Sequence, residues 1–136
     1  MIKSISEILK EVSEAKKEKK VELLRQHDSM PLRSVLAHAL DPAIKWMLPE
    51  GKPPYKPTEA VDQHNRLYQE ARKFYIFCDP NLDLPKMKRE MLFIELLESV
   101  DPEDAELLIA CKDKKIPYKG INAKLVNEAF PGLINN

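Results

Sequence analysis

Glycine and cysteine are both scarce in this sequence, and their scarcity excludes two classes of small protein. Only three of the 136 residues are glycine, at Gly51, Gly120 and Gly132. A β-sandwich or barrel needs many tight turns. Three glycines, together with long Leu-, Glu-, Lys- and Ala-rich runs, therefore argue against both folds. Two cysteines, Cys78 and Cys111, are too few for a disulfide framework, and both lie in apolar-periodic runs. We expect two buried free thiols and a reducing cytoplasm.

Long apolar runs and a net charge are also missing. No stretch approaches the roughly 18 consecutive apolar residues of a membrane-spanning helix. The first 20 residues are amphipathic and highly charged, so we expect no signal peptide. Lys and Arg total 22, as do Asp and Glu, and this balance weakens any claim of broad, non-specific nucleic-acid binding. We therefore expect a cytoplasmic protein without membrane contact.

What remains has the composition of an ordinary globular domain. Hydrophobic residues make up 43% of the chain and charged residues 32%. A chain of 136 residues fits one domain, and no repeat or low-complexity linker divides it. Apolar residues recur at helical spacing throughout. The pattern predicts an all-α fold, one compact domain over residues 1–136 with about seven to eight short helices.

Residues that cap helices precede the predicted helices at five places. They are Ser4, Ser29, Thr58, Asp101 and Asn122. Ser4 and Glu7 form a capping box, in which each side chain accepts from the backbone N–H of the other residue. Pro31 and Pro102 stand where the first turn of a helix tolerates proline. The first helix is expected to end near Ala15.

For two of the predicted helices, the sequence indicates which residues face the core. The helix that begins at Thr58 is expected to bury one face made of Val61, His64, Tyr68, Ala71, Tyr75 and Cys78. His64 is interpreted as a packed core residue. The helix that begins at Pro85 is expected to turn inward Met87, Met91, Ile94 and Leu97. The two methionines are interpreted as core filler rather than as a binding surface.

Signatures of catalysis and of metal binding are weak or missing. Asp79, Asn81, Asp83 and Glu90 have the spacing of an EF-hand calcium loop, but Leu84 stands where that loop needs glycine. An ordinary turn is expected there. We find no Gly-rich phosphate loop, no nucleotidyl-lysine motif, no zinc spacing and no nucleophile in a motif context. The sequence predicts a non-enzyme without metal or cofactor.

Charge is unevenly distributed despite the zero total. Residues 90–106 hold seven acidic side chains and no basic one, whereas residues 112–124 hold five lysines and one acid. The chain can therefore present an acidic face and a basic face. A further run, KKEKKVELLRQH from Lys16 to His27, is interpreted as the solvated face of a helix.

The basic turn before the last predicted helix is the strongest candidate site. Four lysines crowd into eight residues, with an interleaved tyrosine and then a glycine that lets a ligand approach the backbone. The N–H groups at the start of a helix lack internal partners and attract anions. The candidate phosphate contacts are Lys112, Lys114, Lys115, Tyr118, Lys119, Gly120, Asn122 and Lys124. The alternative is a solvated loop in which Gly120 serves only as a turn residue.

Both ends of the chain resemble a known family. LLIACKDKKIPYKGINAKLVNEAFPGLI, residues 107–134, resembles the end of the N-terminal DNA-binding domain of ATP-dependent DNA ligases, most closely the T-even-type bacteriophage ligases. In that family a helix leads into a short basic or polar turn with a glycine, and a second helix follows. The phage version ends in a similar Pro-Gly-Leu-Ile. The opening segment, residues 5–49, resembles the ligase opening, while residues 56–99 agree only in helical pattern.

The resemblance implies an all-helical domain that grips duplex DNA, mainly across the minor groove, through backbone contacts. It assigns such contacts to Lys119, Gly120, Asn122 and Lys124, with Lys115 and Tyr118 beside them. Pro117 is unlike the family turn. A ligase continues into an adenylation domain, and its nucleotidyl lysine has no counterpart here, so no nick sealing is expected.

Two functions follow from these observations. The first is a non-catalytic protein of a tailed phage that binds double-stranded DNA, intact or nicked, through the phosphate backbone. The alternative is an adaptor on the same fold that binds a phage or host protein of replication, transcription or the virion, with the acidic segment 90–106 as its surface. Convergence of the lysines of residues 112–124 on one face favours DNA, and scatter favours the adaptor.

Overall fold

Helices make up the regular secondary structure of the chain, as the apolar periodicity predicts. The computed structural model describes residues 3–58 and 66–134, and no strand occurs within these ranges. The elements are α1 (Ile5–Glu14), α2 (Lys17–Gln26), α3 (Met30–Leu40), α4 (Arg66–Glu70), the 3-10 helix η1 (Ala71–Lys73), α5 (Tyr75–Cys78), α6 (Lys86–Ser99), α7 (Pro102–Lys112) and α8 (Ala123–Ala129). The expectation of an all-α domain is confirmed.

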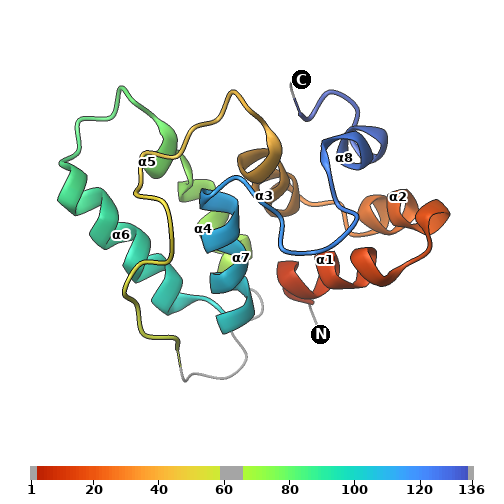
Figure 1. Cartoon of the computed structure of the whole chain (residues 1–136), viewed down its shortest axis with the longest axis horizontal. Helices are drawn as coiled ribbons and strands as arrows, with labels where there is room; N and C mark the ends of the chain where they lie inside the picture. The colour runs from red at the N-terminus through yellow and green to blue at the C-terminus, as the bar shows by residue number, and fades with distance from the viewer. Residues whose placement is uncertain (1–2, 59–65, 135–136) are drawn as a thin grey trace.

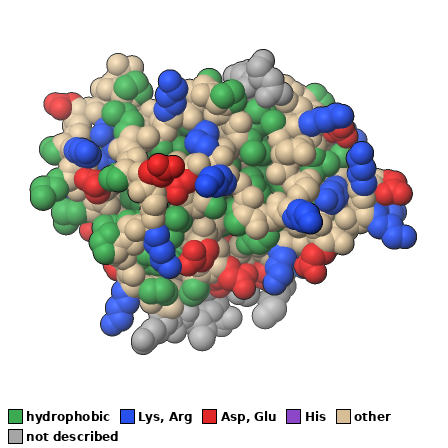
Figure 2. All heavy atoms as spheres, in the orientation of Figure 1, with side chains coloured by type: hydrophobic (Ala, Val, Ile, Leu, Met, Phe, Trp, Pro, Cys, Tyr) green, Lys and Arg blue, Asp and Glu red, His purple; other side chains and the backbone are tan. Residues whose placement is uncertain are grey.

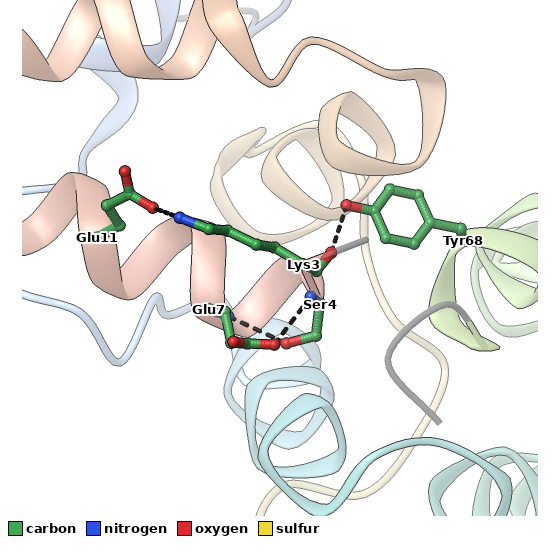
Figure 3. Close-up of polar contacts among 5 residues, drawn as sticks. All are labelled: Lys3, Ser4, Glu7, Glu11 and Tyr68. Atoms are coloured by element: carbon green, nitrogen blue, oxygen red, sulfur yellow. Dashed lines mark hydrogen bonds and ion pairs between the residues drawn. The ribbon is translucent and has the colours of Figure 1, made fainter. Parts of the chain in front are cut away.

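The capping box at the start of α1 forms as predicted. The Ser4 hydroxyl accepts from the Glu7 N–H at 3.2 Å, and the Glu7 carboxylate accepts from the Ser4 N–H at 3.1 Å. Figure 3 shows this reciprocal pair beside the ion pair of Lys3 with Glu11. The Tyr68 hydroxyl donates to the Lys3 carbonyl at 2.9 Å, so the start of α1 is also attached to α4.

Three other predicted caps also form. Ser29 accepts from the Leu32 N–H at the start of α3, and Asp101 accepts from the Glu103 N–H at the start of α7. Asn122 accepts from the Leu125 N–H at 2.9 Å and begins α8. A side-chain cap of this kind contributes about 1 kcal/mol, because it satisfies an N–H group that the helix leaves without a partner.

The core is built around α7, which lies at the centre of the molecule in Figure 1. It packs against α1, α3 and α6 and is buried on several sides. Its buried apolar residues are Ala105, Leu107, Leu108, Ile109 and Cys111. Each fully buried leucine contributes roughly 2 kcal/mol of hydrophobic stabilisation, so α7 fixes the positions of the helices around it.

The helix predicted from Thr58 differs in the structure. His64 and Val61 lie outside the described residues. From Arg66 onward the chain forms α4, η1 and α5 rather than one long helix. The buried side chains are Leu67, Glu70, Ala71, Phe74 and Phe77, whereas Tyr75 is 57% exposed. The Phe77 N–H donates to the Phe74 carbonyl at 3.0 Å, and residues three apart share a helical face, so both rings turn toward the core.

An aromatic cluster lies where Phe74 and Phe77 turn toward the core. Trp46 packs against Phe74, Phe77 and Phe93, with ring centroids 5.8 to 6.1 Å apart. Its indole N–H donates to the His38 carbonyl at 2.9 Å. The irregular segment that follows α3 is therefore anchored to the core by the chain's one tryptophan.

The α6 helix buries Leu97 as predicted, but the rest of its inward face is rotated away from the predicted Met87 and Met91, which are exposed. Its buried side chains are Arg89, Phe93, Leu96 and Leu97. The Arg89 guanidinium donates to the carbonyls of Ile76 and Leu82 at 3.0 and 3.4 Å, which accounts for a buried charge at this position. Residues 87 and 89 lie about 200° apart around a helix, so Met87 points outward.

At the other end of the molecule, α8 packs along α2 (Figure 1). The Arg25 guanidinium of α2 donates to the carbonyls of Glu128 and Ala129 at 2.9 and 3.1 Å. These carbonyls end α8 and have no partner within the helix, so Arg25 both caps α8 and fixes it to α2.

Candidate nucleic-acid interface

Lys112, the first predicted phosphate contact, is used by the fold. Its side chain is only 2% exposed. The ammonium group donates to the Pro49 carbonyl at 2.8 Å and to the Asp113 carboxylate at 2.6 Å. A buried and paired ammonium cannot reach a phosphate on the surface, so Lys112 is not available for the predicted phosphate contact.

Lys114 is likewise committed to an internal contact. Its ammonium donates to the carbonyls of His38, Asp41 and Ile44, each at 2.8 Å, which uses all three of its protons. Its backbone φ of 62° directs the chain out of α7 and toward the end of α3. Burial lowers the pKa of this ammonium. Lys114 therefore joins the end of α7 to the end of α3 and also leaves the predicted interface.

Tyr118 is a packing residue rather than an exposed ring. It is half-buried against the core. Burial raises the pKa of Tyr118 to about 12, and the nearby carboxylates of Glu103 and Asp104 act in the same direction. These neighbours place the hydroxyl close to α7, so the tyrosine serves to hold the turn in place.

The remaining predicted residues are exposed, at the surface of the turn and of α8. They are Lys115, Lys119, Gly120, Asn122 and Lys124. Lys115 follows the end of α7, at the far end of the turn from the other four. The Lys119 carbonyl accepts from the hydroxyl of Ser13, in α1, at 2.6 Å. The later half of the turn is thereby fixed to the junction of α1 and α2.

Gly120 has a defined reason to be glycine. Its φ is +82°, a conformation that other residues adopt only with strain. A Cβ at this position would also collide with the ammonium of Lys20, in α2. What approaches the backbone at Gly120 is therefore a lysine of another helix, which the sequence alone does not indicate.

The Lys20 contact brings two lysine-rich segments together. Residues 16–20 hold four lysines and one glutamate, and only Lys19 of these forms an ion pair among the described residues, at 3.6 Å with Glu22. We define the basic surface as Lys16, Lys17, Lys20, Lys119 and Lys124. Figure 2 shows Lys and Arg side chains gathered over α1, α2 and α8.

The sequence contains the signal for the additional lysines, in the run KKEKK. The residues around this run indicate only a solvated helix face, because they do not show that a turn 100 residues later packs beside it. The lysines of residues 112–124 do not converge as a group, an outcome that by itself favours the adaptor, so DNA binding would depend on the lysines of residues 16–20 as well. Lys112 and Lys114 bind carbonyls of the segment 38–49, whereas Lys119 precedes the Gly120 that Lys20 contacts and Lys124 lies on α8, which packs against α2.

An acidic groove bounds the basic surface along α1. It has a volume of about 930 Å³. The charged side chains along it are Lys3, Glu7, Lys10, Glu11, Glu14, Asp101 and Glu103. Five carboxylates against two ammonium groups repel phosphate, so a polyanion is disfavoured along this groove.

The acidic segment 90–106 does not form one free acidic face. Asp104 is fully buried and accepts from the Ser6 N–H at 2.9 Å. Glu98 accepts from the Lys56 N–H at 2.8 Å, and Glu106 pairs with Lys52 at 3.3 Å. Several of these carboxylates therefore hold the structure together.

The other candidate chemistry from the sequence has structural explanations. The Asp79 carboxylate accepts from the Asn81 N–H at 2.9 Å, which is the hydrogen bond of an ordinary Asx turn. Both cysteines are free, as expected, with Cys111 buried and Cys78 half-buried. Burial raises the pKa of each thiol to about 12, so neither is a reactive thiolate near neutral pH. No helix within the described ranges is long and apolar enough to cross a bilayer.

Comparison with known proteins gives one match. A model of a protein family described as a family of unknown function, DUF6433, matches residues 8–118. The chain belongs to DUF6433. No curated protein and no solved structure matches it. The range that matches DUF6433 contains the KKEKK run of α2, whereas Lys119 and Lys124 of the basic surface lie beyond it.

Proposed function

We propose that this protein binds duplex DNA through phosphate contacts of the basic surface. The observation that carries the proposal is the contact between Lys20 of α2 and Gly120, the residue after Lys119, together with the packing of α2 against α8, which carries Lys124. All of these ammonium groups except the half-buried Lys20 belong to exposed residues. Figure 2 shows Lys and Arg side chains gathered at this end of a molecule without net charge.

Ammonium groups, rather than the N-terminus of α8, provide the attraction. The helix has only seven residues, and Asn122 already accepts from one of its first N–H groups. Contacts between lysine and phosphate fix a protein on DNA without reading sequence. The proposed binding is therefore non-specific and strongly dependent on salt.

The resemblance to the DNA-binding domain of phage ligases supports the same function. It assigns backbone contacts to Lys119 in the turn and to Lys124 in α8, and both residues belong to the basic surface. The proposal extends to a non-catalytic role in a tailed phage, on intact or nicked duplex.

Fluorescence anisotropy with a labelled duplex of about 25 base pairs tests the proposal. Up to five phosphate contacts give a plot of log K against log salt with a slope of about −4 between roughly 50 and 200 mM salt. Nicked duplex, intact duplex and single strand are compared side by side. Tighter binding to the nick would indicate a ligase-like role.

Charge-reversal variants locate the contact. Lys16→Glu, Lys20→Glu and Lys119→Glu combined should abolish binding, whereas Lys86→Glu with Lys88→Glu on α6 should leave most of it. The control pair is exposed and lies at the other end of the molecule. Absence of binding by the wild type at low salt and micromolar protein would overturn the proposal, as would equal losses in the two sets of variants.

The adaptor is the second candidate, and a different surface supports it. The acidic segment is largely occupied by contacts within the fold, as described above. An apolar surface on α6 is better suited to protein binding. The two functions use opposite ends of the molecule, so each can be tested without the other.

A further inference from the structure

The outward face of α6 carries exposed apolar side chains that the fold does not use. Met87 is 77% exposed and Met91 is 54% exposed. Residues 87, 90, 91 and 94 follow helical spacing and so share one face. We define this α6 face as Met87, Glu90, Met91 and Ile94. Figure 2 shows hydrophobic side chains gathered over α6.

An apolar cleft adjoins the α6 face. It has a volume of about 230 Å³, and Glu90 and Ile94 of the α6 face contribute to it. Its apolar lining consists of Leu48, Pro49, Pro53, Pro54, Phe93 and Ile94. Sites for small molecules start at roughly 300 Å³. The cleft is thus of a size for an apolar side chain of a larger partner.

The wall of the cleft opposite α6 is held in place before any partner arrives. This wall is the proline-rich loop, residues 48–57. Glu106 of α7 accepts from the Tyr55 hydroxyl at 3.3 Å and pairs with Lys52 at the same distance. Asp113 accepts from the Gly51 N–H at 3.3 Å. Attachment at several points keeps the cleft formed, which lowers the entropy that binding would cost.

Two glutamates and two lysines line the cleft, and the charge that is left without an ion pair is negative. Lys52 pairs with Glu106 and Lys112 pairs with Asp113, so both cations are neutralised within the fold. Glu50 and Glu90 also line the cleft, and neither forms an ion pair with another described residue. A partner that fits must therefore bring positive charge next to its apolar group.

We propose that the α6 face and its cleft bind an amphipathic helix of a protein partner. The partner inserts an apolar side chain into the cleft, packs its apolar face on Met87 and Met91, and places Lys or Arg against Glu50 and Glu90. Methionine side chains adapt to such faces because they are unbranched and polarizable. A helix lying in a hydrophobic groove is a recurrent mode of peptide recognition.

Charge also distinguishes this partner from a second copy of the chain. A symmetric dimer pairs the same patch with itself. It would bring the Glu50 and Glu90 carboxylates of two copies close together, which is unfavourable. The inference does not rest on DNA binding, because the basic surface lies at the other end of the molecule.

The test uses a designed helical peptide of about 18 residues with leucine at positions i, i+4 and i+7 and lysine on both flanks. A matched peptide carries glutamate in place of lysine. Binding is followed through the methyl NMR signals of Met87, Met91 and Ile94. We expect the lysine peptide to shift these signals and the glutamate peptide to bind at least about tenfold more weakly.

Two pairs of substitutions at exposed or half-buried positions complete the test. Met87→Gln with Met91→Gln should weaken the lysine peptide about tenfold, and Glu50→Gln with Glu90→Gln should reduce the difference between the two peptides. Equal binding of both peptides, or no shift at millimolar peptide, would overturn the proposal. If sedimentation shows a dimer that the two methionine substitutions abolish, the α6 face binds a second copy of the chain and not a partner helix, which would also overturn the proposal.

Discussion

The ammonium of Lys20 occupies the space beside Gly120 that the Cβ of any other residue would take. This contact joins α2 to a turn 100 residues away in the sequence. It brings two separate lysine-rich segments together, while the φ of +82° explains why a glycine stands in the turn.

Replacement of Gly120 by alanine should destabilise the protein by about 1–2 kcal/mol, because its φ of +82° is strained for any L side chain. Gly132→Ala is the matched control, with a φ of +81° and nothing within 4 Å of the added Cβ. Both variants should lose similar stability in thermal unfolding. Only Gly120→Ala should also weaken DNA binding, since only it displaces Lys20. Equal affinity of the two variants for DNA would show that DNA binding does not depend on the Lys20 contact.

Reversal of charge at the turn should change the salt dependence of DNA binding. Lys119→Glu with Lys124→Glu removes two phosphate contacts, which reduces the log–log slope by about 2. Both residues are exposed, so the melting temperature should stay the same. Anisotropy titrations at several salt concentrations, with circular dichroism melting, measure both effects. An unchanged slope would exclude the turn from the interface.

Lys114→Ala should destabilise the fold by about 2–3 kcal/mol, because three carbonyl groups lose a charged donor. Lys115→Ala, at the next and exposed position, should stay within about 0.5 kcal/mol of the wild type. Urea denaturation compares the two. A small loss at position 114 would show that water replaces the ammonium at these carbonyls.

Stability should fall as the pH rises above about 9. Burial raises the pKa of Cys78 and Cys111 from 9.0 to about 12, and that of Tyr118 from 10.0 to about 12. Above pH 9 the unfolded chain loses these protons while the folded protein keeps them. The folded state then binds more protons, so its stability decreases with pH. The lowered pKa of Lys114 acts in the opposite direction, whereas the raised pKa values of Tyr55 and Tyr68 add to the decline.

Melting temperatures across this pH range test the prediction. Cys111→Ala should show a shallower decline than the wild type, because it removes one of these groups. A melting temperature that is constant up to about pH 11 would contradict the burial of these groups.

Features set by neighbouring residues could be predicted from the sequence. The Ser4 capping box, the Asn122 cap and the start of α7 at Pro102 each depend on a few adjacent positions. The all-α fold follows from apolar spacing of the same short range.

Features set by distant partners could not be predicted. Met87 was expected in the core and is exposed, because Arg89 finds carbonyl acceptors on another segment. Lys114 looked like a surface lysine, but its acceptors lie about 70 residues earlier. Lys20 is the converse case, an apparently solvated side chain that completes a surface with the turn at Gly120.

The position of Trp46 gives the protein an internal optical reporter. Its indole N–H and the Lys114 ammonium donate to the same carbonyl, that of His38. Release of Lys114 from this carbonyl would therefore alter the surroundings of the chain's only tryptophan. Emission spectra can follow the opening of the α3–α7 connection without any attached dye.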